Sequence, residues 1–464
     1  MKPWTPHKYQ VDAAKFLISS PSAALFADPG LGKTSIALSA IKAFKLVEPQ
    51  LKTLVIAPKA VCYLVWPQEI QKWTDFHNLT YKILHGKFKA DDLCTDSDIY
   101  IINPEGLKWL FSIYNPRIHA QFGTLIFDEL SKFKSAGTLR HRLLKKCPIP
   151  FKRRWGLTGS PRANGLMGLF GQFYALDRGA TLGRFITHYR NEYFYQSANR
   201  FTWTLRHDAE TAIYLKIAPI TLRLAAKDYI DLPEMIETNI PVALPPSAKK
   251  IYKELEREFV TEIQNKTLAV STVAAAAMKC QQVANGAVYA DDNWVEVHSE
   301  KIEALQNLID ELQGAPIIVA YTFQHDLKRL VDHFGMFTPF LGAGVTMSHA
   351  LKIAEKWNEG KIPILLANPQ SWSHGLNLQN GGNHICWFSM TWDYEIYDQL
   401  ICRVLRQGSN AEKVFVYRIV AEGTLDLTMV KVLEAKREGQ DKMFVELEKL
   451  KRRTCDVSRV TEAV

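Results

Sequence analysis

The chain has 464 residues, too many for one ordinary hydrophobic core, and its 47% hydrophobic and 23% charged residues are typical of a soluble globular protein of two or three domains. It contains neither a signal-peptide core nor an apolar run near the roughly 18 residues that a membrane span needs. Its seven cysteines form no C-x-x-C pair, which argues against a zinc module. This cysteine usage favours a reducing compartment, which would be the cytoplasm or else the nucleoid or nucleus. The net charge of +9 favours a polyanionic partner.

Apolar runs and helical patterns alternate in two separate parts of the chain, which is typical of parallel sheets covered on both faces. The first part, 1–165, predicts an ATP-binding α/β lobe with strands at 22–27, 53–57, 99–102, 124–127 and 155–158. Over 166–295 the alternation stops, and we expect a helical insertion and connection. It resumes over 296–464, where we expect a second lobe with a helix at 301–312, strands near 316–320, 363–367, 384–388 and 414–419, and a C-terminal helix at 425–453.

A glycine-rich segment at 27–34, Ala-Asp-Pro-Gly-Leu-Gly-Lys-Thr, matches a loop whose backbone N–H groups cradle nucleotide phosphates. It lies between a predicted strand and a predicted helix, which places the phosphates at a helix N-terminus. Lys33 would reach the β- and γ-phosphates, and the Thr34 hydroxyl would ligate Mg²⁺. The residues expected to bind the nucleotide here are Pro29, Gly30, Leu31, Gly32, Lys33 and Thr34. The alternative is a glycine-rich turn with a surface lysine.

An acidic pair, Asp128 and Glu129, ends the predicted strand at 124–127, where α/β sheets bind their ligands. In a nucleotide hydrolase Asp128 would hold Mg²⁺, usually through water, and Glu129 would orient and deprotonate the attacking water. An isolated pair of this kind is more often a solvated strand end. The phosphate loop upstream favours the catalytic interpretation.

In the second lobe, Gln399, Arg403 and Arg406 are spaced to share one face of a helix that Asp393 would cap and Gly408 would end. Two arginines on one face suggest stabilisation of γ-phosphate charge across a lobe interface. A solvated basic face is the alternative. The polar loop at 373–379, which contains Gly375, suits contact with nucleotide or backbone phosphates.

Taken in order, these motifs resemble those of the Swi/Snf-like ATPases, which are DNA translocases of helicase superfamily two. The segments that carry the resemblance are His-Lys-Tyr-Gln at 7–10, the run from Leu54 to Trp73, Leu-Thr-Gly-Ser-Pro at 157–161, Ser-Glu-Lys at 299–301, Gly-Leu-Asn-Leu at 375–378, and the glutamine and arginines at 399, 403 and 406. The resemblance implies two RecA-like lobes, ATP and Mg²⁺ as nucleotide and metal, and Gln10 as the contact to the base. It also implies that 54–73 touches the DNA backbone and that Arg403 and Arg406 are arginine fingers.

The chain departs from the family pattern at two places. Leu130 and Ser131 follow the acidic pair where the family has a small residue and a histidine, and Ser409 replaces a glutamine. No segment resembles a chromatin-reading module, a nuclease or a zinc finger, so we expect a small translocase of viral or bacterial type.

The leading functional hypothesis is an ATP-dependent motor on duplex or forked DNA rather than RNA, with no membrane partner. A strand-separating helicase and the motor or clamp of a larger assembly are the alternatives. For two basic segments, the sequence leaves two interpretations open: contact with DNA, or an ordinary structural role. One comprises Arg140, Arg142, Lys145, Lys146, Lys152, Arg153 and Arg154; the other interleaves Arg184, Arg190, Arg200 and Arg206 with Phe185, Tyr189, Tyr193, Phe194, Tyr195, Phe201 and Trp203.

Overall fold

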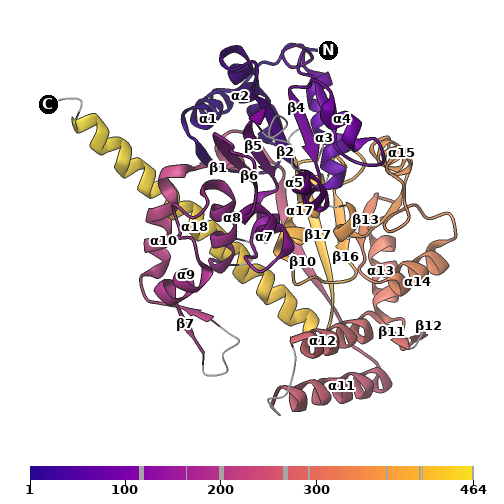
Figure 1. The fold of residues 1–464 in the computed structure, drawn as a ribbon. Coiled ribbons are helices and arrows are strands. Elements are labelled where there is room, and N and C mark those ends of the chain that lie inside the picture. Colours follow the sequence, from indigo (N-terminus) through magenta and orange to yellow (C-terminus); the bar gives the residue numbers. More distant parts are fainter. Residues whose placement is uncertain are drawn as a thin grey trace. The chain divides into compact units, whose positions relative to one another are not determined.

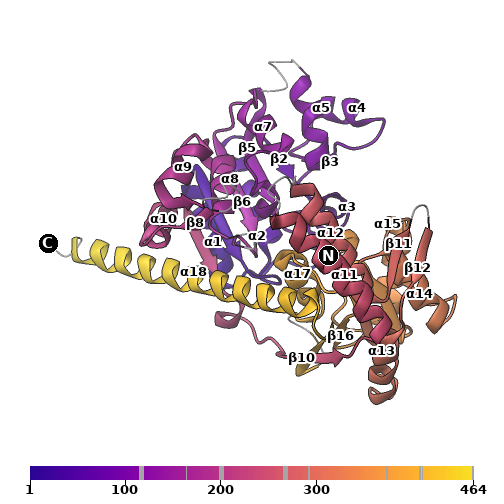
Figure 2. The same cartoon turned by 90° about the horizontal axis from the view of Figure 1, so that it is seen from below.

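The computed structural model describes residues 1–113, 120–162, 165–197, 203–264, 270–290, 293–372, 375–406, 409 and 411–461, without side-chain detail at 258–264, 270–273, 372, 448 and 450–461. The chain forms two compact units: unit 1 comprises Met1–Asp231 and Lys436–Val464, and unit 2 comprises Leu232–Ala435. Each unit contains a parallel sheet with helices (Figures 1 and 2), which confirms the predicted α/β class with two parallel-sheet lobes.

The sheet of unit 1 has seven parallel strands in the order β3-β4-β2-β5-β6-β1-β9. The strands are β1 (Ser22–Ala27), β2 (Lys52–Ile56), β3 (Tyr81–Ile83), β4 (Ile99–Ile102), β5 (Phe122–Asp128), β6 (Arg153–Thr158) and β9 (Thr221–Leu224). The central strands are almost wholly buried because helices cover both faces, and they therefore read as continuous apolar runs. All five predicted strands are confirmed. The two that sequence did not predict, β3 and β9, are short and only partly buried.

Helices surround this sheet and share its core (Figure 1). They are α1 (Lys8–Ser19), α2 (Lys33–Val47), α3 (Lys59–Lys72), α4 (Lys89–Cys94), α5 (Leu107–Ser112), α7 (Leu139–Lys145), α8 (Met167–Asp177), α9 (Ile186–Tyr193) and α10 (Ala209–Ile217), with 3₁₀ turns η1 (Pro104–Gly106), η2 (Leu130–Phe133), η3 (Ala218–Ile220) and η4 (Ala226–Asp228) and a hairpin of β7 (Phe194–Gln196) and β8 (Trp203–Leu205). One core cluster joins Phe26 of β1 with Phe173 of α8 and Ile213 of α10.

The sheet of unit 2 has six parallel strands in the order β10-β17-β16-β13-β15-β14. They are β10 (Glu234–Val242), β13 (Ile317–Ala320), β14 (Phe340–Leu341), β15 (Ile364–Ala367), β16 (His384–Trp387) and β17 (Lys413–Ala421), and the other elements are α11 (Pro246–Gln264), α12 (Val270–Asn285), the hairpin β11 (Ala287–Ala290) and β12 (Asn293–Glu296), α13 (Glu300–Glu311), α14 (Gln324–Phe334), α15 (Met347–Asn358), α16 (Pro369–Trp372) and α17 (Tyr394–Val404). The four predicted strands of this lobe are confirmed.

The last helix, α18 (Leu425–Thr461), starts in unit 2 and belongs to unit 1 from Lys436 onwards. Its start is held by a fully buried ion pair between Lys301 Nζ and Asp426 Oδ2 at 2.6 Å. Lys301 also donates to Asn285 Oδ1 and to the Phe388 carbonyl. The Ser-Glu-Lys segment at 299–301, one of those that carry the family resemblance, therefore contains a main anchor of the second lobe.

The two units divide the predicted insertion at 166–295 between them. Residues up to Asp231 pack on the first sheet and add β9 beside β1, whereas β10 pairs along its whole length with β17 in the second sheet. The strand β10 was not predicted from sequence. It is an edge strand with several exposed positions and contains Pro241, so it lacks the continuous apolar run of a central strand. Within the described part of the chain, no helix is both long and apolar enough to cross a membrane.

Candidate nucleotide site

The segment between β1 and α2 has the shape of a phosphate loop. Gly30 and Gly32 have positive φ angles, 90° and 76°, a conformation that side chains disfavour. A Cβ on Gly32 would lie 2.6 Å from Gln10 Nε2, so a side chain there would be strained by the positive φ and would also displace the Gln10 amide. The first backbone bond of α2 runs from Ile36 N–H to the Gly32 carbonyl (2.9 Å), and the preceding N–H groups point out of the helix end. The loop is therefore a cradle that backbone amides line.

Lys33 lies over this loop. Its Nζ donates to the Ala27 carbonyl (2.8 Å) and contacts the Asp28 carbonyl (3.4 Å). Thr34 follows it as the second residue of α2 and is partly exposed. The hydroxyl of Thr34 and the carboxylate of Asp128 are oxygen ligands of the kind that Mg²⁺ prefers, so the donor set fits that ion.

Asp128 ends β5 and is only 7% exposed. Burial raises the pKa of its carboxyl, while a hydrogen bond from Trp66 Nε1 (2.8 Å) and the charge of Lys33 act in the opposite direction. The next residue, Glu129, has a φ of 65° although it is not glycine, a conformation that costs about 1 kcal/mol. Backbone strain that begins where a central strand ends marks this turn as a candidate functional position.

The helix α3 supports the site from behind. Trp66 is fully buried, and Glu69 Oε2 accepts hydrogen bonds from Ser35 Oγ of α2 (2.7 Å) and from Trp73 Nε1 (2.8 Å). The resemblance implied that this segment touches the DNA backbone. For Trp66 that expectation is wrong, because its ring packs inside the lobe and orients Asp128.

The end of β6 also meets the loop. Thr158 is fully buried, and its Oγ1 accepts a hydrogen bond from the Ser160 amide (3.2 Å). A Cβ on Gly159 would lie 3.4 Å from Pro29 Cδ. The Leu-Thr-Gly-Ser-Pro segment therefore contacts the phosphate loop directly.

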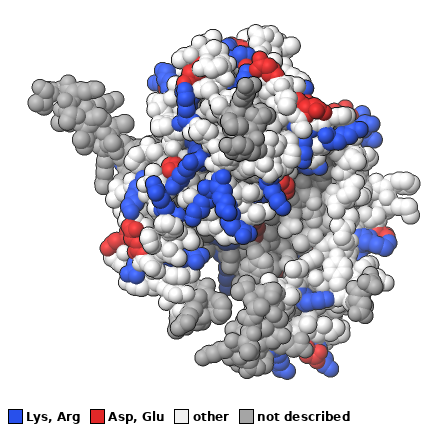
Figure 3. Space-filling model, in the orientation of Figure 1, with Lys and Arg blue, Asp and Glu red and all other residues white. Residues whose placement is uncertain are grey.

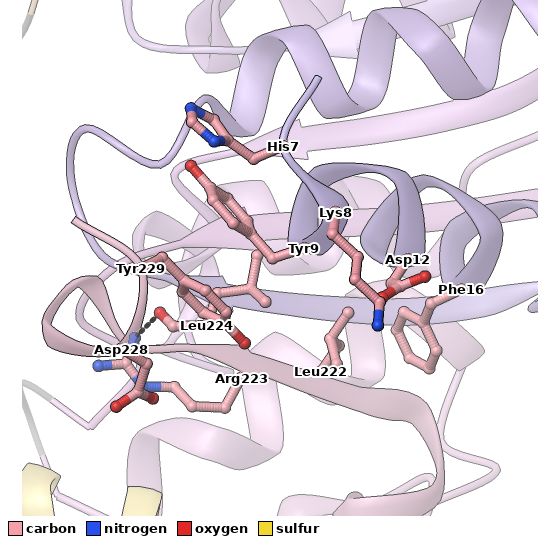
Figure 4. A pocket seen from close by; sticks show the side chains of 10 residues that line it. All are labelled: His7, Lys8, Tyr9, Asp12, Phe16, Leu222, Arg223, Leu224, Asp228 and Tyr229. Atoms are coloured by element: carbon pink, nitrogen blue, oxygen red, sulfur yellow. Dashed lines mark hydrogen bonds between the residues drawn. The ribbon is translucent and has the colours of Figure 1, made fainter. Parts of the chain in front are cut away.

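A pocket of about 700 Å³ opens at the start of α1 (Figure 4). Its lining residues come from α1, β9 and η4 and from the two residues that flank α1 and η4: His7, Lys8, Tyr9, Asp12, Phe16, Leu222, Arg223, Leu224, Asp228 and Tyr229. The rings of Tyr9 and Tyr229 lie 4.4 Å apart, and the ring of His7 stacks on Tyr9 at 5.5 Å. Gln10 itself is buried, with Oε1 accepting from His7 N–H (3.0 Å) and Nε2 donating to the Leu31 carbonyl (3.2 Å). Its amide thus links α1 to the phosphate loop.

Arg223, which no motif of the sequence indicates, ties the edge strand β9 to the phosphate loop. Arg223 Nη2 lies 2.6 Å from Asp28 Oδ1, and the Ala226 amide donates to Asp28 Oδ2 (2.9 Å). The ring of Phe444, from α18, covers the guanidinium at 3.7 Å. The available signal was Asp28 itself, since an acid inside a phosphate-binding loop needs a cation nearby.

The predicted residues of unit 2 also come together. Arg403 Nη1 donates to the Leu376 carbonyl (3.4 Å), and Arg406 donates to Asn377 Oδ1. Gln399 is buried in α17, 3.4 Å from Glu395, and Gly375 adopts a φ of 89°. Both arginines therefore contact the Gly-Leu-Asn-Leu loop.

The predicted helix around these arginines is correct at its start and too long at its end. Asp393 caps it, its side chain accepting from Glu395 N–H (3.0 Å). The helix ends at Val404, so Arg406 lies beyond it and does not share a helical face with Arg403. Ser373, His374 and Gly408 lie outside the described residues.

The first basic segment is split by the fold. Arg140 pairs with Glu105, Lys152 and Arg153 pair with Glu48, and Arg154 is buried. Arg142, Lys145 and Lys146 are exposed on or next to α7. Figure 3 shows lysine and arginine side chains gathered over the region of α7 and α8.

Most aromatics of the second basic segment form core. Tyr189, Tyr193 and Phe194 belong to the core cluster of unit 1, so for them the structural alternative is correct. Phe185 and Tyr195 are exposed, and Arg206 lies 4.2 Å from the Tyr195 ring. Arg200 and Phe201 lie outside the described residues.

Comparison with known families gives two adjoining matches. Residues 9–288 match the family described as SNF2-related domain, and residues 300–408 match the helicase conserved C-terminal domain. The predicted resemblance is therefore confirmed.

Similar proteins come from phage, bacteria and plants. Protein p41 of Acyrthosiphon pisum secondary endosymbiont phage 1 is 35% identical over 98% of this chain and 100% of its own length. An uncharacterized ATP-dependent helicase of Mycoplasma genitalium is 23% identical over 95% of this chain and 42% of its own length, and a CHD3-type chromatin-remodeling factor of Arabidopsis thaliana is 24% identical over 93% and 37%. The chain thus spans the whole phage protein but less than half of these two larger relatives.

Among solved structures, the Sulfolobus solfataricus SWI2/SNF2 ATPase core in complex with dsDNA is 20% identical and covers 97% of each chain, with a TM-score of 0.45.

Proposed function

Because the chain belongs to the SNF2-related family of helicase-like ATPases, we propose that it hydrolyses ATP to move along or remodel duplex or forked DNA. The observation that carries the proposal is a group of features within unit 1: a glycine-lined phosphate loop, Lys33 above it, and the turn of Asp128 and Glu129. The carboxylate of Asp128 is buried, and the charge of Lys33 acts on its pKa. The family membership supports ATP as the nucleotide. The names of two relatives, an ATP-dependent helicase and a chromatin-remodeling factor, support nucleic acid as the partner.

In this proposal the loop amides and Lys33 hold the phosphates of ATP. Thr34 and Asp128 would hold Mg²⁺, which when bound offsets the negative charge of the phosphates. Glu129 orients the attacking water and accepts its proton. The base enters the pocket at the start of α1, where the rings of Tyr9 and Tyr229 supply stacking surface.

Arg403 and Arg406 are proposed as the residues of the second lobe that stabilise charge on the γ-phosphate when the lobes close. Gly375 and Gln399 would line the same face of that lobe. Alternate closing and opening would then let the two lobes grip and release DNA in turn. Exposed cations on and after α7, Arg142, Lys145 and Lys146, are the described candidates of the first basic segment for phosphate contacts.

A strand-separating helicase is a second candidate, and the exposed Tyr195 with Arg206 favours it, since aromatic and cationic side chains on a hairpin suit stacking at a fork. One panel tests both functions: ATP hydrolysis against single-stranded, duplex, forked and four-way DNA and RNA, together with an unwinding assay on forks and blunt duplex. The motor on duplex DNA predicts stimulation by duplex without strand release. Stimulation by RNA alone, or none by any DNA, would contradict it.

A further inference from the structure

A second pocket of unit 1 lies at the amino ends of its strands, whereas the phosphate loop follows the carboxyl end of β1. It has a volume of about 340 Å³ and lies where β1 and β6 begin and α8 ends. The polar residues that line it include Ser22, Lys152, Arg154, Asp177 and Arg178. Because the nucleotide loop follows the carboxyl end of β1, this pocket at the amino ends is separate from the nucleotide site.

Arg154 is one of the residues that line this pocket, and one of its nitrogens has no hydrogen-bond partner among the described residues. The residue is 5% exposed, and its Nη1 donates to the Ala175 carbonyl (3.2 Å). Nη2 is buried too, yet it has no hydrogen-bond partner among the described residues. The guanidinium lies over the Phe151 ring, 5.6 Å from its centroid, but a buried charged donor without a hydrogen bond still costs free energy that a ligand would recover. Burial, together with the charge of Arg178, lowers the pKa of Arg154 to about 10.

The pocket holds more positive than negative charge. Arg178 is exposed, and its Nη2 makes only long contacts, each 3.4 Å, to the Cys147 and Ile149 carbonyls. Lys152 at the rim already pairs with Glu48 (2.7 Å). The acid of the pocket, Asp177, accepts the backbone N–H groups of three residues that follow it, Gly179 (2.8 Å), Ala180 (3.0 Å) and Thr181 (2.9 Å).

Unpaired carbonyl groups give a helix C-terminus a partial negative charge that repels anions. This repulsion is weaker at the end of α8, because two of its carbonyl groups accept hydrogen bonds from side chains. Arg154 Nη1 covers the Ala175 carbonyl, and the Ser22 hydroxyl donates to the Leu176 carbonyl (3.1 Å). The remaining donors, Arg154 Nη2 and the Arg178 guanidinium, are those that bind tetrahedral oxyanions well.

We propose that this pocket binds a phosphate group, with Arg154 and Arg178 as its ligands. The pocket has room for either of two sources of that group, free inorganic phosphate or a phosphate monoester such as the terminal phosphate of a nucleic acid strand. The site is independent of the proposed ATPase activity.

The first test is a titration of the whole protein with inorganic phosphate, against potassium chloride at matched ionic strength. Saturating Mg-ADP keeps the nucleotide loop filled. The wild type should show a saturable rise in Tm, and Arg178→Gln should bind phosphate at least about 10-fold more weakly because one charge-assisted bond is lost. The exposed Arg184→Gln is the matched control and should behave like the wild type. Arg178 is chosen because it is exposed, whereas a change of the buried Arg154 would disturb folding. No saturable shift in the wild type, or equal affinity in Arg178→Gln, would overturn the proposal.

A competition then identifies the source of the phosphate. Displacement of bound phosphate by a 5′-phosphorylated oligonucleotide, but not by its 5′-hydroxyl form, assigns the pocket to a strand end. Displacement by neither assigns it to free phosphate. Equal displacement by both would overturn the proposal, because the bound phosphate would then lie on a general backbone-binding surface.

Discussion

Arg223 and Asp28 form an ion pair of 2.6 Å that joins the edge strand β9 to the phosphate loop. Arg223 is anchored on its other side by backbone carbonyls, since its Nη1 donates to Leu224 O (2.7 Å) and contacts Phe26 O (3.3 Å). The loop is thus held from the side by a strand that contains none of the short motifs recognised in the sequence. We therefore expect Arg223 to be a positioning residue that acts through Asp28.

Arg223→Met should lower kcat/KM for ATP by about 10- to 100-fold, because a displaced phosphate loop misaligns every group on it. A purely structural role would lower Tm and leave KM unchanged in the fraction that stays folded. The exposed Lys227→Met is the control. Asp28→Asn should cause a similar loss, and the double variant should lose little more than either single variant, since both changes break one interaction. Additive losses would contradict the coupling.

Asp128→Asn should abolish ATP hydrolysis. In the absence of nucleotide, it should nevertheless raise the free energy of unfolding by about 1 kcal/mol at pH 8. Burial raises the pKa of Asp128, so the carboxyl stabilises the fold only while protonated, and this contribution is lost as pH rises through the raised value. Asparagine keeps an acceptor for Trp66 Nε1. Urea unfolding from pH 8 to pH 4 should show the advantage of the variant shrinking as pH falls. A stability advantage of Asp128→Asn that grows towards acid pH would contradict the raised pKa of the Asp128 carboxyl.

Glu210→Gln should loosen the attachment of α18 to unit 1. Burial alone would raise the pKa of Glu210, but hydrogen bonds from Lys442, Tyr214 and Arg162 outweigh it and lower that pKa to about 2. The stabilisation is therefore present above the ordinary glutamate pKa of about 4.3 and lost as pH falls towards 2. Hydrogen exchange of the α18 amides at pH 7 should be faster in the variant. Unchanged protection would show that the other contacts of α18, which include the hydrogen bond from Arg162 to the Gly439 carbonyl (2.8 Å), hold the helix without Glu210.

Lys301→Met should destabilise the protein by about 3–5 kcal/mol, because it leaves the buried carboxylate of Asp426 without its cation. Chemical denaturation of the variant measures this loss. Replacing both partners, Lys301→Met with Asp426→Leu, should recover part of it. A loss below about 1 kcal/mol in the single variant would contradict the buried pair as an anchor of the second lobe.

The local motifs could be predicted from sequence because each is a short run whose chemistry is fixed by its spacing. The loop at 27–34 and the turn at Asp128 and Glu129 lie where they were expected, and the buried strands next to them were recognisable as apolar runs. By contrast, β9 and β10 are edge strands with half-exposed positions, so their sequences carry no such run. Trp66 and Arg223 were missed as parts of the site because their partners lie 62 and 195 residues away, and only the fold brings them together.

The assignment of Glu129 as the general base is tested by its isosteric variant. Glu129→Gln should bind ATP with the wild-type Kd and hydrolyse it at least about 100-fold more slowly, since only proton transfer is removed. Lys33→Ala is the companion variant, and it should lose nucleotide affinity as well.

The most direct test of the central claim is the steady-state rate of phosphate release from ATP, measured for the wild type and Glu129→Gln with and without saturating linear duplex DNA. The account predicts a low wild-type rate without DNA, a rise of about 10-fold or more with duplex, and no rise in Glu129→Gln. A wild-type rate that duplex DNA leaves unchanged, or a Glu129→Gln rate equal to the wild type, would contradict it.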